Sequence, residues 1–201
     1  AIAASFVLSV VEPNATSIGG DCFAIVKMEG KNPVAYNGSG IAPGKASYDY
    51  FKKNKIDKIG LTSPHSVTIP GALDAWKNIH KDFGKLDFEE LFLKAIDFAK
   101  NGFRVTKVVA DAWSNNLSKL SENKNSKKLL LNNGKSYQFS EIRKNIPLGE
   151  TLELINKKGI SEFYKGSIAE DMVNCLNELG GLHTVEDFSK QKTIKSETIS
   201  S

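Results

Sequence analysis

The chain has 201 residues, of which 40% are hydrophobic and 25% are charged, and it carries a net charge of +4. This length suffices for one domain with a substantial core, and the composition is that of ordinary globular proteins. The positive excess is small, and the lysine clusters lack interleaved aromatic side chains. We therefore expect a solvated surface and no nucleic-acid partner.

The number and spacing of the cysteines argue against a fold that is stabilised by zinc or by disulfide bonds. Cys22 and Cys175 lie far apart in the sequence, and neither belongs to a CxxC pair or adjoins a histidine. This spacing disfavours both a zinc site and a disulfide framework, so we predict no metal and no cofactor. Each cysteine is expected to act as a small buried hydrophobe.

Membrane attachment and export have no clear signal in this sequence. No segment reaches the roughly 18 consecutive apolar residues of a membrane helix, so no membrane partner is predicted. Residues 1–11 are apolar but lack the basic residues that begin a signal peptide. Without an initial Met, we expect residue 1 to be interior to a longer gene product. Both a cytoplasmic and a secreted location stay open.

The N-terminal part predicts a helix followed by two strands. Residues 1–11 are apolar nearly all round, which predicts a helix buried on every side and ended by Pro13. Residues 22–28 form a nearly continuous apolar run, as in a strand covered on both faces, and residues 34–36 form a second strand. The glycine-rich loop at 37–44 is expected to let backbone approach a ligand closely.

The remainder of the chain reads mainly as helices. Predicted helices are a short polar one at 47–53, one at 72–83, one at 87–100 capped by Asp87, one beginning at Thr106, and others at 148–158, 167–179 and after Thr184. Residues 121–135 are polar and predict a surface excursion, and the tail 190–201 reads as the start of a strand. Two short strands do not form a stable sheet alone, so we expect further strands from outside this chain.

Several segments in a fixed order carry a resemblance that covers nearly the whole chain. They are VVEP and SIGGDCF within 10–23, IAPGKAS at 41–47, VTIPGALDAW at 67–76, the stretch 83–105, FYKGSIAEDMV at 163–173, and GGLHTVEDF at 180–188. Together they resemble the large subunit of the gamma-glutamyltransferase family. The resemblance implies an α+β protein with the four-layer αββα N-terminal nucleophile hydrolase fold. This chain would supply mostly helices plus two or three strands, as a single domain, 1–201, that is incomplete without a small subunit.

The chemistry of that family implies that this chain holds no catalytic residue. Such precursors process themselves and expose a threonine at the start of a small subunit. Its hydroxyl attacks the acyl carbonyl of γ-glutamyl compounds such as glutathione. The resemblance therefore implies a heterodimer whose nucleophile and oxyanion hole lie on the small subunit from the same precursor. Thr184, Thr193 and Thr198 cannot replace that nucleophile, because none of them is a chain terminus.

The substrate-binding residues predicted in this chain are Ser39 and Asn37. No residue is predicted to bind a metal ion. Well-known family members grip the α-carboxylate of the substrate with an arginine, and alignment through Ala42 and Pro43 puts Ser39 at that position. Serine offers one hydrogen bond and no charge, whereas an arginine fork matches a carboxylate. Ser39 thus resembles the branch that includes glutaryl-type acylases. The alternative is that the loop is only a turn beside a differently built pocket.

Other polar residues receive structural assignments. Asp21 stands where the family usually has glycine, and we expect it to bind nearby backbone N–H groups. His65 lies next to serines in SPHSVT, but such close spacing is not a catalytic triad, and His80 and His183 are read as structural. A further alternative from another class remains open: a non-catalytic helical binding module or fragment.

Overall fold

The structure, a computed structural model, describes residues 1–199. It divides them into two compact units, one made of residues 1–17 and 86–153 and the other of residues 18–85 and those from 154 onward. The single domain expected for 1–201 stays a prediction.

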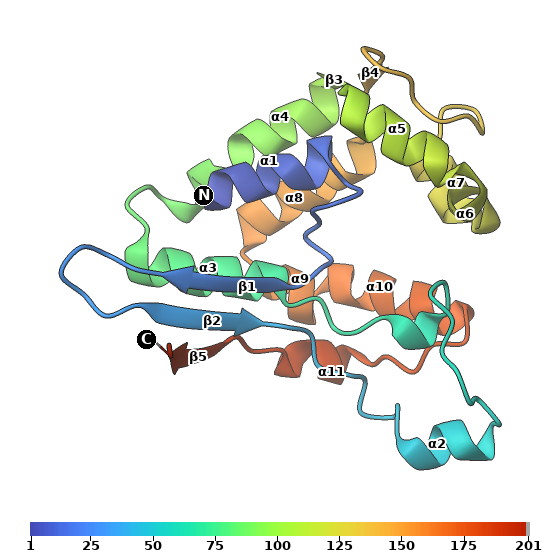
Figure 1. The fold of residues 1–201 in the computed structure, drawn as a ribbon, viewed down its shortest axis with the longest axis horizontal. Coiled ribbons are helices and arrows are strands. Elements are labelled where there is room, and N and C mark those ends of the chain that lie inside the picture. Colours follow the sequence, from blue (N-terminus) through green and yellow to red (C-terminus); the bar gives the residue numbers. More distant parts are fainter. Residues whose placement is uncertain (200–201) are drawn as a thin grey trace. The chain divides into compact units, whose positions relative to one another are not determined.

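The first unit is mainly helical. Its elements are α1 (Ile2–Val11), the 3₁₀ helix η2 (Phe88–Phe92), α4 (Leu93–Asn101), β3 (Phe103–Arg104), α5 (Lys107–Asn115), α6 (Leu117–Glu122), α7 (Lys124–Leu130), β4 (Ile142–Arg143) and most of α8 (Ile146–Lys158) (Figure 1). β3 and β4 pair antiparallel. The excursion at 121–135 is largely exposed, as predicted, but it contains the end of α6 and the whole of α7, which the polar composition concealed.

The core of this unit is built around Phe6 of α1. Its ring centroid lies 4.0 Å from that of Phe92 and 6.0 Å from that of Phe88. The opposite face of α1 leaves Ala3 and Ala4 exposed. The expectation of a helix buried on every side was therefore wrong for this chain, because α1 packs on η2 and α4 along one face only.

Helix starts in this unit show where local sequence is informative. Thr106 caps α5 as predicted, since its hydroxyl accepts a hydrogen bond from the backbone N–H of Val109. Asp87 makes no such bond, and the predicted single helix at 87–100 is instead η2 followed by α4. The capping prediction for Asp87 was wrong, because the chain turns as a 3₁₀ helix before the α-helix begins.

A buried arginine joins three parts of the first unit. The Arg143 guanidinium lies 5.0 Å from the ring centroid of Trp113 and 5.7 Å from that of Tyr137. Its Nη2 donates to the carbonyl of Leu129 at 3.3 Å. Burial lowers the pKa of Arg143. The two aromatic faces offset part of the desolvation of this charge, so Arg143 ties β4 to α5 and to the end of α7.

The second unit holds a three-stranded sheet with helices. Its elements are β1 (Cys22–Val26), β2 (Val34–Gly38), α2 (Tyr48–Lys53), the 3₁₀ helix η1 (Pro64–Ser66), α3 (Ala72–Phe83), the end of α8, α9 (Ser161–Lys165), α10 (Ser167–Glu178), α11 (Val185–Lys190) and β5 (Ile194–Glu197). β1, β2 and β5 lie side by side in that order, and both pairings are antiparallel (Figure 1). β5 confirms a strand in the predicted tail, while residues 200 and 201 of that prediction lie outside the described part.

The two faces of this sheet have different surroundings. On one face Tyr36 is only 2% exposed, and its ring meets Phe83 of α3 edge-on. On the other face Phe23 is 68% exposed, Ile25 is 71% exposed and Ile194 is 63% exposed. The apolar run at 22–28 had predicted a strand covered on both faces, and this was wrong for the present chain. Only one helix layer of this unit packs on the sheet, so alternate apolar residues of β1 remain uncovered.

An acidic residue of α3 joins the covered face of the sheet to this helix. The Asp82 carboxylate accepts hydrogen bonds from Tyr36 of β2 and from Lys195 of β5. The bond from Lys195, followed by that from Tyr36, lowers the pKa of Asp82. Burial and the neighbouring Asp82 raise the pKa of Tyr36. Both partners therefore keep the charge states that the hydrogen bonds require at neutral pH.

We expect the stability to fall in acid partly through Asp82. Its folded-state pKa lies below the unfolded value of about 3.9, so its contribution is present above that pH and is lost as the pH falls through the folded pKa. Asp82→Asn should flatten the decline of Tm below pH ~4, whereas Asp171→Asn, on the exposed side of α10, should leave the slope unchanged. An unaltered slope for the Asp82 variant would contradict this assignment.

Candidate functional site

The two predicted substrate-binding residues lie together where β2 ends. The side chain of Asn37 accepts the backbone N–H of Ser39 at 2.9 Å, which makes a tight turn of the first loop residues. The backbone N–H of Gly40 donates to Asp21 Oδ1 at 2.8 Å, which confirms the prediction that Asp21 binds backbone. Asn37 is paired with Phe23 in the sheet, so this polar turn adjoins the uncovered apolar face.

Side chains in the turn keep donors free. Ser39 is half-buried and Asn37 is exposed. Within residues 1–199, the Ser39 hydroxyl and the Asn37 amide N–H₂ have no hydrogen-bond partner, because the turn uses only the Asn37 oxygen and the Ser39 backbone. These two groups can therefore donate to an acceptor on a bound molecule.

The loop is held from a distant part of the chain. Gln191, which follows α11 and is 6% exposed, donates from Nε2 to the carbonyl of Ser39 at 3.0 Å. Its Oε1 accepts the N–H of Ile41 at 3.1 Å. The Asp187 carboxylate of α11 accepts the N–H of Gly44 at 3.0 Å. Three hydrogen bonds from one C-terminal segment thus fix both ends of the loop.

Asp187 also serves its own helix. It forms a reciprocal capping box with Thr184, so the predicted cap of this helix is confirmed. Burial alone would raise the pKa of Asp187, but hydrogen bonds from Thr184 and from the backbone of Gly44 outweigh it, and the net shift is downward. Asp187 therefore stays ionised and holds Gly44 as a charge-assisted acceptor.

Glycines let the loop pack against the segment before α3. A Cβ on Gly40 would lie 2.0 Å from the carbonyl oxygen of Ile69, and one on Gly71 would lie 2.1 Å from that of Gly38. Separations this short leave no room for a Cβ unless the backbone shifts. The close backbone approach that the glycine spacing predicted is thus made to residues 69–71 of this chain, whereas the sequence interpretation had assigned it to a ligand.

Two of the three histidines, His65 and His183, make structural contacts. His183 is buried, and its Nε2 lies 2.8 Å from the carbonyl oxygen of Val67, so it supports the turn before α11 as predicted. The His65 ring packs edge-on against Tyr50 and Phe51. None of these contacts brings a histidine to the Ser39 turn.

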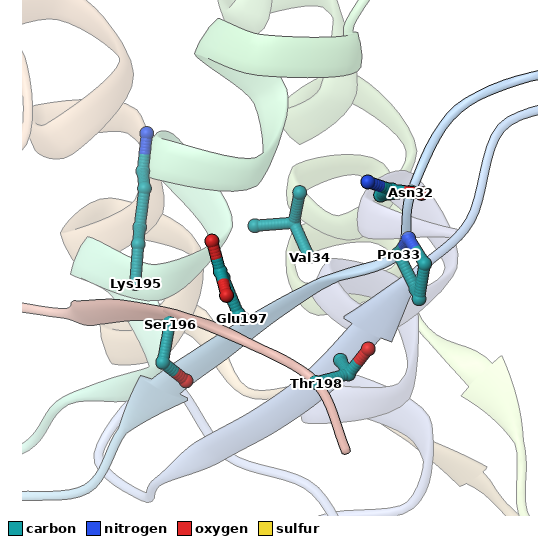
Figure 2. A pocket seen from close by; sticks show the side chains of 7 residues that line it. All are labelled: Asn32, Pro33, Val34, Lys195, Ser196, Glu197 and Thr198. Atoms are coloured by element: carbon teal, nitrogen blue, oxygen red, sulfur yellow. The ribbon is translucent and has the colours of Figure 1, made fainter. Parts of the chain in front are cut away.

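An open groove of about 600 Å³ lies at the other end of the sheet. It is lined by residues 32–34 and 195–198, and Lys195 and Glu197 project from the same side of β5 (Figure 2). Neither predicted binding residue lines it. Among the described residues, no group of three or more metal-binding side chains occurs, and no helix has the length and apolar character to cross a bilayer.

Replacing Gln191 tests the anchoring of the loop. Gln191→Ala leaves the carbonyl of Ser39 and the N–H of Ile41 without these partners, so we expect the free energy of unfolding to fall by about 1–3 kcal/mol. Urea denaturation measures this change. The matched variant Gln138→Ala, whose side chain makes only exposed local bonds, should stay within about 0.5 kcal/mol of the parent. Equal effects of the two variants would refute the anchoring role.

Comparisons with known proteins agree over the whole chain. A family model described as Gamma-glutamyltranspeptidase matches residues 1–201. The chain is 32% identical over 194 residues to a glutathione hydrolase-like proenzyme of Bacillus subtilis, covering 96% of this chain and 37% of that protein. It is 29% identical over 204 residues to a glutathione hydrolase proenzyme of Escherichia coli, covering 100% of this chain and 35% of that protein. It thus spans little more than a third of these relatives.

Solved structures show the same fold. Helicobacter pylori gamma-glutamyltranspeptidase superposes with a TM-score of 0.90 at 26% identity, covering 98% of this chain and 58% of that one. A cephalosporin acylase from Bacillus halodurans superposes with a TM-score of 0.90 at 28% identity, covering 99% of this chain and 38% of that one.

Proposed function

This chain belongs to the gamma-glutamyltranspeptidase family, and from that premise we propose that it is the large-subunit part of an enzyme that transfers or hydrolyses γ-glutamyl or related acyl amides, glutathione among them. Family membership confirms the resemblance that the ordered motifs carried. The structural neighbours confirm the α+β class and the N-terminal nucleophile hydrolase fold. The described part of this chain contributes mostly helices, a three-stranded sheet and the two-stranded pair β3 and β4.

The observation that carries the proposal is the polar turn at the end of an uncovered sheet face. Asn37 and Ser39 present free donors there, and the apolar side chains of Phe23 and Ile25 lie exposed beside them. Exposed apolar patches of this kind mark surfaces that another body covers. We propose that the small subunit from the same precursor covers this face and brings its catalytic threonine to the turn.

The proposed reaction uses groups of both subunits. The hydroxyl of the small subunit's N-terminal threonine attacks the acyl carbonyl carbon, and the threonine α-amine takes the hydroxyl proton. The amide C–N bond then breaks, the proton passes to the leaving amine, and an ester acyl-enzyme remains. Water or an acceptor amine attacks that ester and restores the threonine. In this scheme Ser39 and Asn37 hold the acyl group during both steps.

A glutaryl-type or other acyl-amide acylase is the second candidate. Ser39 brings no positive charge for the α-carboxylate of a glutamyl group. In addition, one of the solved structures that share this fold is named a cephalosporin acylase. Comparing kcat/KM on γ-glutamyl and glutaryl anilides separates the two candidates.

The proposal is tested by intact-mass analysis of the purified full-length gene product under denaturing conditions, with N-terminal sequencing of every chain found in it. A second chain that begins with threonine is the expected result and means that autoprocessing has occurred. An uncut precursor, or this chain alone, would contradict the enzymatic proposal and favour a non-catalytic helical binding module.

A further inference from the structure

Asp21 stands directly before β1 and faces the Ser39 turn. Its Oδ1 accepts the backbone N–H of Gly40 at 2.8 Å, which places the carboxylate against the loop. Cys22 pairs with Gly38 in the sheet, so Asp21 lies just beyond the ladder where Ser39 leaves the neighbouring strand. The side chain is exposed, and its second oxygen has no hydrogen-bond partner within residues 1–199. This oxygen is available to a molecule bound at the turn.

Carboxylates bind the backbone at both ends of this loop. Asp21 forms no ion pair with any lysine, arginine or histidine of the described part of the chain. A second carboxylate, that of Asp187, binds the other end of the loop at Gly44. The neighbouring donors, on Ser39 and Asn37, are uncharged. A carboxylate placed at this turn would gain two neutral hydrogen bonds but would meet an unpaired negative charge.

We propose that Asp21 determines specificity by binding an ammonium group on the acyl part of the substrate. The enzyme then favours acyl groups that carry an amine, such as γ-glutamyl, over acyl groups that end in a carboxylate alone, such as glutaryl. This inference rests on the proposed function and chooses between its two candidates. Asp21 attracts the α-ammonium, while the Ser39 hydroxyl and the Asn37 amide donate to the α-carboxylate.

The expected size of the effect follows from exposure. An exposed charge pair contributes up to about 1 kcal/mol, which corresponds to about fivefold in an equilibrium constant. Both substrates carry the same carboxylate, so its repulsion by Asp21 cancels when their rates are divided. The ratio of kcat/KM for the ammonium-bearing substrate to that for the carboxylate-only substrate should therefore fall by about fivefold when the negative charge is lost, mainly through KM.

The experiment compares the full-length enzyme with its Asp21→Asn variant. The asparagine oxygen still accepts the N–H of Gly40, so the substitution removes the charge and keeps the loop contact. Steady-state rates are measured on the p-nitroanilides of γ-glutamic acid, glutaric acid and uncharged pentanoic acid. Asp171→Asn, an exposed carboxylate of α10, makes the same change of charge elsewhere. We expect the rate ratio of γ-glutamyl to glutaryl anilide to fall about fivefold in the Asp21 variant only.

Ionic strength supplies an independent readout. Added salt should reduce the γ-glutamyl preference of the parent enzyme and leave that of the Asp21 variant nearly constant, because salt screens exposed charges. If the anilides are hydrolysed but the ratio is the same in parent and variant, the inference is overturned and the proposed function stands. If the parent hydrolyses none of the three, the proposed function fails and the inference falls with it.

Discussion

Replacing Gly40 by alanine should lower the free energy of unfolding by about 3 kcal/mol and disorganise the turn that holds Asn37 and Ser39. The new Cβ would lie 2.0 Å from the carbonyl oxygen of Ile69 and 2.6 Å from the Thr68 hydroxyl. The carbonyl belongs to backbone, which cannot rotate away as a flexible side chain can. The loop must therefore separate from residues 69–71, and overpacking of this kind costs roughly 1–3 kcal/mol or more.

Urea denaturation of the two glycine variants measures this difference. Gly60→Ala is the matched control, because a Cβ there meets no atom within 4 Å and Gly60 is exposed. We expect that control to stay within about 0.5 kcal/mol of the parent. In the full-length enzyme, Gly40→Ala should also lower kcat/KM on the acyl anilides. If Gly40→Ala proves as stable as Gly60→Ala, the close packing of the loop is refuted.

Ile25→Lys should abolish assembly of the proposed two-subunit enzyme and leave this chain folded. Ile25 is 71% exposed and is the last residue but one of β1, so a lysine there meets solvent in the separate chain. In the proposed enzyme the same face is covered by the small subunit, and burying an unpaired ammonium costs several kcal/mol. We expect activity to fall at least about 100-fold, the factor that corresponds to about 2.7 kcal/mol.

The assembly prediction is checked by size-exclusion chromatography, anilide hydrolysis and circular dichroism of the same preparations. Leu61→Lys is the control, because Leu61 is 89% exposed and lies outside the sheet. It adds the same charge and should retain both assembly and activity. An active, assembled Ile25→Lys enzyme would show that no subunit covers this face.

The sequence predicted features that depend on neighbours in the chain. The helix at 72–83 was predicted with the observed bounds, and the caps at Thr106 and Thr184 were correct. Helix periodicity and capping act over three or four residues, so a single sequence displays them. The order of the motifs likewise predicted the family, because a resemblance is itself a property of sequence.

Features set by distant contacts could not be predicted in this way. Gln191 binds a loop that lies 150 residues earlier, and nothing in its own neighbourhood marks it. Asp187 looked like a helix cap only, yet it also holds Gly44. Both residues are polar and buried, and this combination would have marked them as anchors. Burial, however, is known only once the chain is folded.

The family, the fold class, most of the helices and the two residues of the candidate turn could be predicted from the order of the amino acids. Three features became known only from the folded chain: which sheet face is covered, which segment anchors the turn, and that Asp21 lies beside Ser39. The difference comes from the range of the interactions involved. Periodicity reports that a strand is apolar, but whether Phe23 and Ile25 meet a helix or solvent depends on which elements the whole chain can supply.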